Sequence, residues 1–472
     1  MSTPTQTQSD FQRDTRRAVE DRRQRAIVAK GIATYTSKVS ETKAQYLDFE
    51  WGRLALRERK AAAHAHLDES LLAFERAATA RGTQVHWAED AAAARALVLE
   101  IARRHGVKRV IKSKSMVTEE LELNDFLAGQ DIAAVESDLG EYIVQLRGEK
   151  PFHIVTPAMH LSREDVGHTF QDKLGSAPGL SAEGLTMEAR RVLRPEFLRA
   201  EMGITGANFL VAETGMIALT TNEGNGRLTL SLPRVHVAIA GIEKVIPRLQ
   251  DLALFWPMLA VAGTGQQMTT YNTLVAGPRQ PGEADGPDEF HVILLDNGRT
   301  RLLADPEQRE ALHCIRCGAC LNACPVFAVV GGHAYGTTYQ GPLGLVIMPH
   351  LRGLETYQHL PRASSLCGAC TEVCPVSIDL HHHLLRHRRN AVERGLGGGF
   401  ELVLMRLLAW AYARAGRYRV AMALAGAGRR LLGWLRLEGT WLDPARRWSA
   451  TRALPPFPRQ SFRKWWATRR AP

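Results

Sequence analysis

Along the first 300 residues, apolar residues recur with two different spacings, one typical of strands and one typical of helices. "TQVHWA" (83–88) and "VKRVIKS" (107–113) are short runs of the kind that form strands. "EDAAAARALVLEIARRHG" (89–106) and "SMVTEELELNDFLAG" (115–129) have the wider spacing of helices, and the first ends at Gly106. Strand, helix, strand, helix at this spacing predicts a parallel α/β sheet.

Further segments extend this domain in both directions. "ANFLVAETGMIALTT" (207–221) and "VHVAIAGI" (235–242) are apolar enough to be buried strands. An α/β domain is therefore predicted over 81–300, after an Arg-, Ala- and Glu-rich helical segment over 1–80. "DNGRTRLLADPEQREALH" (296–313) predicts a turn followed by a polar helix.

The composition is that of a globular protein with several domains. The chain has 472 residues, of which 45% are apolar and 23% are charged. Its first 26 residues mix acidic residues with arginines and lack an apolar core, unlike a secretory signal or a good transit peptide. No apolar run is long enough to span a bilayer. Both absences favour the cytoplasm.

The net charge of +11 is concentrated at the C-terminal end. From Glu401 onward there are fifteen Arg or Lys against three Asp or Glu, together with six of the nine tryptophans. A helical basic segment is predicted over 391–472, beginning near the flexible "GLGGG" (395–399). Arginine with tryptophan suits the inner face of a membrane or an acidic partner, and packing on its own domain is the alternative. Nucleic acid is not expected, because no binding motif accompanies the charge.

All seven cysteines lie in two short motifs. C-x2-C-x2-C-x3-C-P comprises Cys314, Cys317, Cys320 and Cys324, and C-x2-C-x3-C-P comprises Cys367, Cys370 and Cys374. An odd, clustered set argues against a disulfide framework. Zinc sites use two C-x2-C knuckles without a third cysteine or a trailing proline. The spacing therefore predicts iron–sulfur clusters in an α-helical ferredoxin-type domain over 301–390.

The fourth cysteine of such a motif ligates the other cluster in two-cluster ferredoxins. This rule assigns cluster 1 to Cys314, Cys317, Cys320 and Cys374, and cluster 2 to Cys324, Cys367 and Cys370. A complete second motif would have a cysteine at position 364, where this chain has Ser364. Ser364, a water, an outside ligand or a three-iron cluster are the alternatives for the missing ligand.

Polar residues follow several predicted strands, where open α/β sheets place ligands. They are Ser113, Lys114, Ser115, Glu136, Asp138, Glu141, His153, His160, Glu213, Thr214 and Asn222. Lys114 near two serines could hold a carboxylate, whereas capping, turn hydrogen bonds and a salt bridge are the structural interpretation.

Three other patterns receive structural interpretations. "TNEGNGR" (221–227) predicts a hairpin turn of the Asn-Gly type. His383 and His387 are four residues apart, but no partner carboxylate or cysteine is in view, so a solvated basic helix is expected. "GLGGGF" narrowly misses the dinucleotide fingerprint and follows no strand, and there is no P-loop.

Taken together, these motifs resemble the lactate utilisation protein B (LutB) family. The residues that carry the resemblance are "CIRCGACLNACPVF" (314–327), "SSLCGACTEVCPV" (364–376), "KSKSMVTEELELN" (112–124), "ESDLGEYIVQL" (136–146), "HIVTPAMH" (153–160), "ETGMIALTTNEGNGR" (213–227) and "SFRKWW" (461–466). The family's N-terminal lactate-utilisation (LUD) domain is similar to the CoA-transferase/ribose-isomerase type of α/β fold. A three-cysteine second motif belongs to the family pattern, whereas the histidine-rich "DLHHHLLRHRRN" (379–390) departs from it.

The resemblance implies electron transfer through two clusters, of the 4Fe–4S type, during oxidation of L-lactate to pyruvate. It also implies a LutA-like iron–sulfur protein and a LutC-like protein as partners. The residues identify no catalytic group and no two-electron acceptor. An iron–sulfur subunit of another hydroxy-acid dehydrogenase, a catalytic α/β domain and a scaffold with structural clusters are therefore the alternatives.

Overall fold

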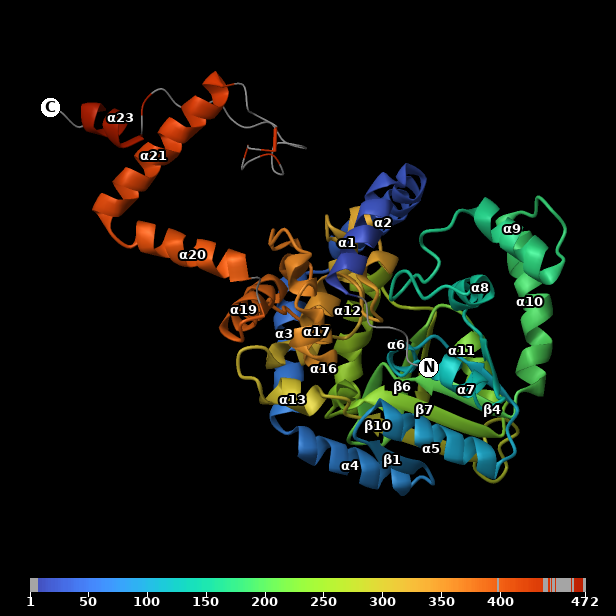
Figure 1. Cartoon of the computed structure of the whole chain (residues 1–472). Helices are drawn as coiled ribbons and strands as arrows, with labels where there is room; N and C mark the ends of the chain where they lie inside the picture. Colours follow the sequence, from blue (N-terminus) through green and yellow to red (C-terminus); the bar gives the residue numbers. More distant parts are fainter. Residues whose placement is uncertain are drawn as a thin grey trace. The chain divides into compact units, whose positions relative to one another are not determined.

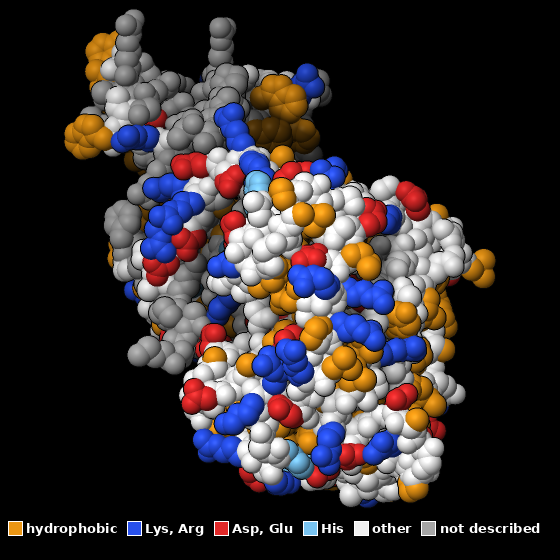
Figure 2. Space-filling model, turned by 90° about the vertical axis from the view of Figure 1, so that its right-hand side faces the viewer, with side chains coloured by type: hydrophobic (Ala, Val, Ile, Leu, Met, Phe, Trp, Pro, Cys, Tyr) orange, Lys and Arg blue, Asp and Glu red, His pale blue; other side chains and the backbone are white. Residues whose placement is uncertain are grey.

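The computed structural model describes residues 7–396, 399–435, 440–441, 443, 446, 460 and 462–469. The chain divides into two compact units, one ending at Leu396 and one beginning at Gly397. The first unit holds both sheets and all seven cysteines. The boundaries predicted at residues 80, 300 and 390 stay predictions. On the face shown in Figure 2, basic and acidic side chains are interspersed among scattered apolar ones.

A six-stranded parallel sheet forms the centre of the first unit (Figure 1). Its order is β1 (Gln84–Ala88), β10 (Glu289–Leu295), β7 (Val235–Gly241), β4 (Met202–Gly206), β2 (Arg109–Lys112) and β3 (Ala133–Glu136). Every neighbouring pair is parallel. This confirms the predicted parallel α/β core and the strands at 83–88, 107–113 and 235–242.

Both faces of this sheet are covered, because each strand turns alternate side chains to opposite faces. Val237 and Ile239 of β7 pack in one core with helices α5 (Ala91–Arg104), α6 (Met116–Glu120) and α7 (Leu123–Ala128). Ala238 and Ala240 belong to a second core with α4 (Leu67–Thr79). Beyond β3, helices α8 (Leu139–Arg147), α9 (Arg163–Leu174) and α10 (Ala182–Arg199) complete the domain.

The segment 207–221 forms two strands of a smaller second sheet. Its order is β8 (Val245–Ile246), β5 (Phe209–Val211), β6 (Met216–Thr221) and β9 (Tyr271–Val275), and β5 pairs with β6 antiparallel. The predicted Asn-Gly hairpin at 221–227 is wrong. After β6 the chain enters α11 (Asn225–Ser231) instead, and the next strand, β7, belongs to the large sheet.

Two predicted helices are each broken into shorter pieces. The helix at 115–129 divides into α6 and α7, because Glu122 between them has a left-handed φ of 50°. The polar helix at 296–313 divides into α13 (Arg299–Ala304) and the 3-10 helix η3 (Arg309–His313). Arg299 is 1% exposed, so this segment contributes a buried cation rather than a polar surface.

The N-terminal helices and the cysteine region share one hydrophobic core. Its helices are α1 (Gln8–Glu20), α2 (Arg22–Lys43), α3 (Phe49–Ala65), α12 (Leu252–Thr264), α13, α14 (Ala319–Asn322), α15 (Phe327–Val330), α16 (Gly341–Arg352), α17 (Leu354–Tyr357), α18 (Ala369–Glu372) and α19 (Leu380–Glu393). Phe49 and Leu56 of α3 lie in the same core as Cys317 and Cys374. The N-terminal segment therefore helps to build the cysteine site.

The described part of the second unit is helical. It contains α20 (Gly399–Tyr412), α21 (Ala415–Trp434) and α23 (Phe462–Arg469). Large apolar side chains such as Leu407, Trp410 and Trp434 are exposed on these helices. Trp448 and the glycines at 397 and 398 lie outside the described residues. Among the helices described, none is long and apolar enough to cross a membrane.

Candidate cysteine centre and an adjoining cavity

The two cysteine motifs have the same local backbone. The sequence CGAC occurs in both, fifty residues apart. The glycines Gly318 and Gly368 have φ of 81° and 82°, a region that glycine occupies without strain. Two residues earlier, Arg316 and Leu366 also have positive φ, at 63° and 56°. Each motif therefore turns tightly around its first cysteines and then enters a short helix, α14 or α18.

Ser364 occupies the place that Cys314 has in the first motif. The backbone N–H of Arg316 donates to Cys314 Sγ at 3.3 Å, and the N–H of Leu366 donates to Ser364 Oγ at 3.1 Å. In each loop, a backbone N–H thus donates to the side chain of the residue two positions earlier. A hydroxyl stands where the complete motif has a thiol.

The seven cysteines fall into two spatial groups that each draw on both motifs. Cys314, Cys317, Cys320 and Cys374 line one small cavity of about 20 Å³, together with Ile154, Leu343 and Ile378. The second group is Cys324, Cys367 and Cys370. Burial is the largest cause that raises the pKa of Cys370, and the charges of Cys324 and Cys367 raise it further. Cys374 thus lies with the first three cysteines of the other motif.

Burial disfavours the charged form of most of these thiols. It raises the pKa of Cys370 to about 11 and that of Cys374 to about 12. Cys367 is exposed, and the backbone N–H of Ala369 lowers its pKa. A soft metal displaces such protons and is held by the thiolates. Thiols converging on a small apolar cavity fit an iron–sulfur cluster better than a solvated ion.

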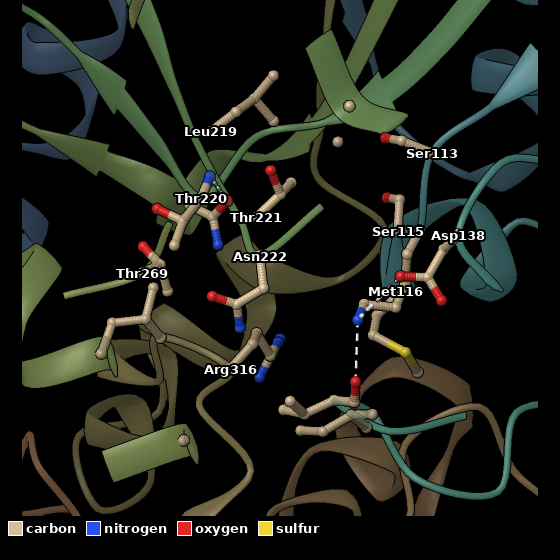
Figure 3. A pocket seen from close by; sticks show the side chains of 18 of the residues that line it. Ser113, Ser115, Met116, Asp138, Leu219, Thr220, Thr221, Asn222, Thr269 and Arg316 are labelled. Carbon is tan, nitrogen blue, oxygen red and sulfur yellow. Dashed lines mark hydrogen bonds and ion pairs between the residues drawn. The ribbon is translucent and has the colours of Figure 1, made fainter. Parts of the chain in front are cut away.

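A second, larger cavity of about 390 Å³, seen in Figure 3, shares the lining residues Ile154 and Cys317 with the first. Five of the polar residues selected from the sequence line it, namely Ser113, Lys114, Ser115, Asp138 and Asn222. Figure 3 shows Ser113, Ser115 and Asp138 on one side and Asn222 with Arg316 on the other. Arg316 and Cys317 line the same cavity, so it extends from the sheet to the first cysteine loop.

Lys114 is held within the wall of this cavity. Its Nζ donates to the carbonyl of Val155 at 2.9 Å and lies 3.5 Å from Asp138 Oδ2. Burial alone would lower the pKa of Lys114, but the carboxylates of Asp138 and Glu141 raise it. The lysine is therefore charged at neutral pH and already has an anionic partner.

The other polar residues selected from the sequence have structural roles. Glu136 forms a buried ion pair with Lys112 at 2.7 Å, and His160 bonds Glu149 at 2.8 Å. The ring of His153 accepts from two backbone N–H groups at 3.1 and 3.2 Å.

Three more of these residues lie outside the cavity lining. Glu141 lies in the first turn of α8, and burial raises its pKa well above the usual range. Glu213 accepts from the N–H of Leu249 at 2.8 Å, and Thr214 Oγ1 accepts from the N–H of Met216 at 3.4 Å. The capping and turn interpretation is thus the better one for Glu213 and Thr214.

The expected solvated helix at 379–390 is wrong. His383 and His387 on α19 are 0% and 2% exposed. His387 Nε2 lies 2.8 Å from the carbonyl oxygen of Val346, and burial lowers the pKa of His387 to about 4. His387 is therefore a neutral core residue, because an uncharged imidazole can be buried when it is hydrogen-bonded.

A buried network of charges joins the sheet to the first cysteine loop. Arg299 lies 2.9 Å from Glu120 and 2.6 Å from Glu243. Arg316 lies 3.3 Å from the other oxygen of Glu243, and Tyr339 donates to Glu120 at 2.7 Å. Burial alone would raise the pKa of Glu243, but Arg299 and Arg316 lower it to about 2.

These residues were not selected from the sequence. Glu243 and Lys244 directly follow the predicted strand 235–242, so the strand-end rule that found Ser113 would also have found them. Arg316 lies inside the cysteine motif, where only the thiols were considered. Glu120 lies in a predicted helix, and nothing in its local pattern distinguishes it from a surface glutamate.

Comparisons with known proteins agree with this two-part organisation. Residues 71–295 match the LUD domain family, and residues 310–378 match the 4Fe-4S dicluster domain family. A solved structure of a duf162 family protein from Deinococcus radiodurans covers 48% of this chain and 98% of its own, at 15% identity and a TM-score of 0.28. That likeness is too weak to carry an argument.

Relatives of known sequence cover most of the chain. "Uncharacterized electron transport protein YkgF" of Escherichia coli (strain K12) is 38% identical over 98% of this chain and 97% of its own. "Lactate utilization protein B" of Bacillus velezensis is 42% identical over 82% of each chain. The protein of that name from Bacillus subtilis (strain 168) is 40% identical over 82% of this chain and 81% of its own. The chain therefore belongs to the lactate utilization protein B family, whose LUD domain here adjoins a 4Fe-4S dicluster domain.

Proposed function

We propose that this protein transfers electrons through two iron–sulfur clusters during the oxidation of L-lactate to pyruvate. Relatives are named as an electron transport protein and as lactate utilization proteins, and residues 310–378 match a dicluster family. Bound clusters supply one-electron chemistry at potentials set by charge, hydrogen bonds and exposure. The protein's part is to hold them, shield them and bring their partners within reach.

The observation that carries the proposal is the grouping of thiols across the two motifs. Under this assignment Cys314, Cys317, Cys320 and Cys374 hold cluster 1, and Cys324, Cys367 and Cys370 hold cluster 2. One shared cavity for the first four cysteines and the mutual charge effects of the other three support it. Because each motif contributes to both groups, the two clusters would be close neighbours. A polypeptide that shares ligands in this way is suited to pass electrons between them.

Partners and location belong to the same proposal. A LutA-like iron–sulfur protein and a LutC-like protein would supply and accept electrons. A cytoplasmic location, with the basic tail against the inner face of the membrane, stays a prediction from the sequence. The exposed Leu407, Trp410 and Trp434 on α20 and α21 support a docking role for the tail. The CoA-transferase/ribose-isomerase type likewise stays a proposal for the α/β fold.

A second candidate function is that the α/β domain itself oxidises a hydroxy acid. The 390 Å³ cavity favours it, because polar residues at the strand ends and Cys317 line the same space. A substrate bound there would lie next to the first cysteine loop. Reduction of the clusters by L-lactate in the purified chain alone is the result that would distinguish this function from pure electron transfer.

Gene deletion with complementation tests the proposed function. Deleting the gene should abolish growth on L-lactate as the sole carbon source. The wild-type gene should restore growth and Cys370→Ala should not, because cluster 2 would lose one of its three cysteines. Glu372→Gln is the matched control, since this exposed side chain lies on the same helix, α18, and should restore growth. Undiminished growth on L-lactate without the gene would refute the lactate assignment.

A further inference from the structure

The larger cavity lies at the topological switch point of the parallel sheet. From β2 the chain proceeds to β3 on one side, whereas from β4 it proceeds through β7 to β10 on the other. Ser113 and Ser115 follow β2, and Gly206 ends β4, and all three line the cavity. A side chain at Gly206 would meet Ser115 Oγ at 2.7 Å, so glycine allows these segments to approach. Open α/β sheets bind ligands at this crevice.

Lys244 presents an unpartnered cation to this cavity. It ends the 3-10 helix η1 (Ile242–Lys244), which follows β7, and it is 5% exposed. Among the described residues it has no hydrogen bond, and no carboxylate lies within 4.0 Å of its ammonium nitrogen. Burying an ammonium without a partner is unfavourable, so a lysine in this position needs a reason.

Arg316 adds a second incompletely satisfied cation to the same wall. Its Nη2 pairs with Glu243 at 3.3 Å, but its Nη1 is buried and has no hydrogen-bond partner. In Figure 3 the guanidinium of Arg316 lies beside Asn222. A guanidinium that still has donors to offer suits two oxygens of a carboxylate or phosphate.

The acidic groups nearby do not neutralise this pair. Glu243 is shared between Arg299 at 2.6 Å and Arg316 at 3.3 Å. Asp138, on the side of the cavity opposite Arg316, is 3.5 Å from Lys114. Glu223 also lines the cavity, where burial raises its pKa toward the neutral form. Among the described residues, Lys244 therefore has no carboxylate at ion-pair distance and Arg316 has only the shared Glu243, while Cys314 is the other negatively charged group that acts on both cations.

We propose that this cavity binds a small organic anion, and that Lys244 and Arg316 hold its carboxylate or phosphate oxygens. The serines after β2 and Asn222 offer hydrogen bonds to the rest of the molecule. Since Cys317 lines the same cavity, the bound anion lies against the first cysteine loop. The choice of probes below rests on the proposed function, whereas the cavity and its two cations do not.

Calorimetric titration of the anaerobically prepared full-length protein tests the inference. The probes are L-lactate and pyruvate for a carboxylate source, and inorganic phosphate and flavin mononucleotide for a phosphate source. Saturable binding of at least one probe is expected. Comparing the carboxylate probes with the phosphate probes shows whether a carboxylate or a phosphate is recognised. Lys244→Met should weaken that binding at least tenfold. Lys173→Met removes the same charge from the exposed face of α9 and should leave binding unchanged.

A second variant and a second measurement guard against simple misfolding. Asn222→Asp places a carboxylate beside Arg316 at an exposed position, so it should weaken anion binding while the protein stays folded. Removal of an unpaired buried charge should leave the melting temperature of unliganded Lys244→Met unchanged or higher.

Three results would overturn the inference. One is that none of the four probes binds to protein whose iron, sulfide and paramagnetic signals are normal, which would leave the proposed function standing. Another is that Lys244→Met binds the anion as wild type does and alters only the reduction potential of a cluster. Lys244 would then act on the cluster and not on a bound anion. The third is unchanged binding in Asn222→Asp.

Discussion

One side chain, Ser364, makes the difference between a three-cysteine and a four-cysteine second motif. Ser364 accepts a backbone N–H at 3.1 Å, as Cys314 does at 3.3 Å in the first motif. The loop around position 364 therefore has the form of a ligand loop but offers a hydroxyl. A thiolate is a softer and stronger ligand for iron than a serine oxygen. Cluster 2 is consequently expected to be the more labile or the more accessible of the two.

Ser364→Cys should convert the second motif to a complete one. In reconstituted protein we expect the paramagnetic signal of one cluster to change and that cluster to lose iron more slowly on exposure to air. Electron paramagnetic resonance with iron analysis over time measures both. Ser365→Cys is the control, because it adds a thiol one position away from the Cys314 equivalent. If both variants behave as wild type does, Ser364 is not at the ligand position.

Buried and exposed ion pairs should differ in what they contribute. Arg299→Met removes a 1%-exposed guanidinium that pairs with Glu120 and Glu243, so two buried carboxylates lose their main partner. We expect a loss of about 3–5 kcal/mol in the free energy of unfolding. Arg389→Met breaks a half-exposed pair with Glu307 and should cost under about 1 kcal/mol. Urea denaturation of both variants measures this difference, and equal losses would contradict the account.

At the scale of elements, helix α19 shows why a polar-looking sequence can be a core helix. Leu380, His383, Leu384, His387 and Ala391 recur at three- and four-residue spacing and are all buried. That spacing defines one face of a helix, and the histidines belong to it. This buried face is missed if histidine is counted as a polar surface residue. A neutral imidazole behaves as a core residue once its nitrogen is hydrogen-bonded.

This burial makes stability depend on pH. The pKa of His387 is about 4 in the folded protein and about 6.5 in the unfolded chain, so the unfolded chain binds more protons between these values. The contribution of neutral His387 to stability is therefore present above about pH 6.5 and is lost as the pH drops toward 4. His387→Gln should flatten the slope of unfolding free energy against pH by up to about 1.4 kcal/mol per unit. Denaturant titrations from pH 7 to 4.5 test this, and parallel slopes would contradict it.

The local patterns predicted several elements, but the apolar "FHVILL" of β10 was not selected as a strand although its signal is local and strong. Elements decided by their neighbours were also missed. β1, α5, β2 and β7 were predicted because alternation and the end at Gly106 are local signals. The strands β3 ("AAVE") and β4 ("MGITG") are short and lack β-branched runs, so they become strands by pairing with their neighbours, β3 with β2 and β4 with both β2 and β7. Similarly, Ser113 and Asn222 were found, but the cavity they share with Arg316 depends on tertiary contacts.

At the scale of the whole molecule, the cysteine site depends on the N-terminal helices. Arg53 of α3 donates to the carbonyl of Cys374 at 2.8 Å and of Thr371 at 3.2 Å. Phe49 and Leu56 share a core with the thiols. Helix α3 thus supports the second cysteine loop. The described tail helices, by contrast, belong to a separate compact unit.

Two truncations should therefore behave differently. A chain that ends at Leu396 should fold with nearly full iron content, because the first unit contains both sheets and every cysteine. A chain that begins at Leu67 lacks α1 to α3 and should lose most of its iron. Iron analysis and thermal melting of the anaerobically purified truncations measure this. Full iron content in the chain that begins at Leu67 would contradict the supporting role of the N-terminal helices.

The most direct test of the central claim is a redox titration of anaerobically purified protein, followed by electron paramagnetic resonance with iron and sulfide analysis. If the two motifs exchange a cysteine to hold two neighbouring clusters, about seven to eight iron atoms per chain are expected. The fully reduced protein should then show two paramagnets that broaden each other's signals. Cys374→Ala should selectively perturb the cluster held by Cys314, Cys317 and Cys320. Iron-free protein, or a single isolated signal that Cys374→Ala leaves unchanged, would contradict the account.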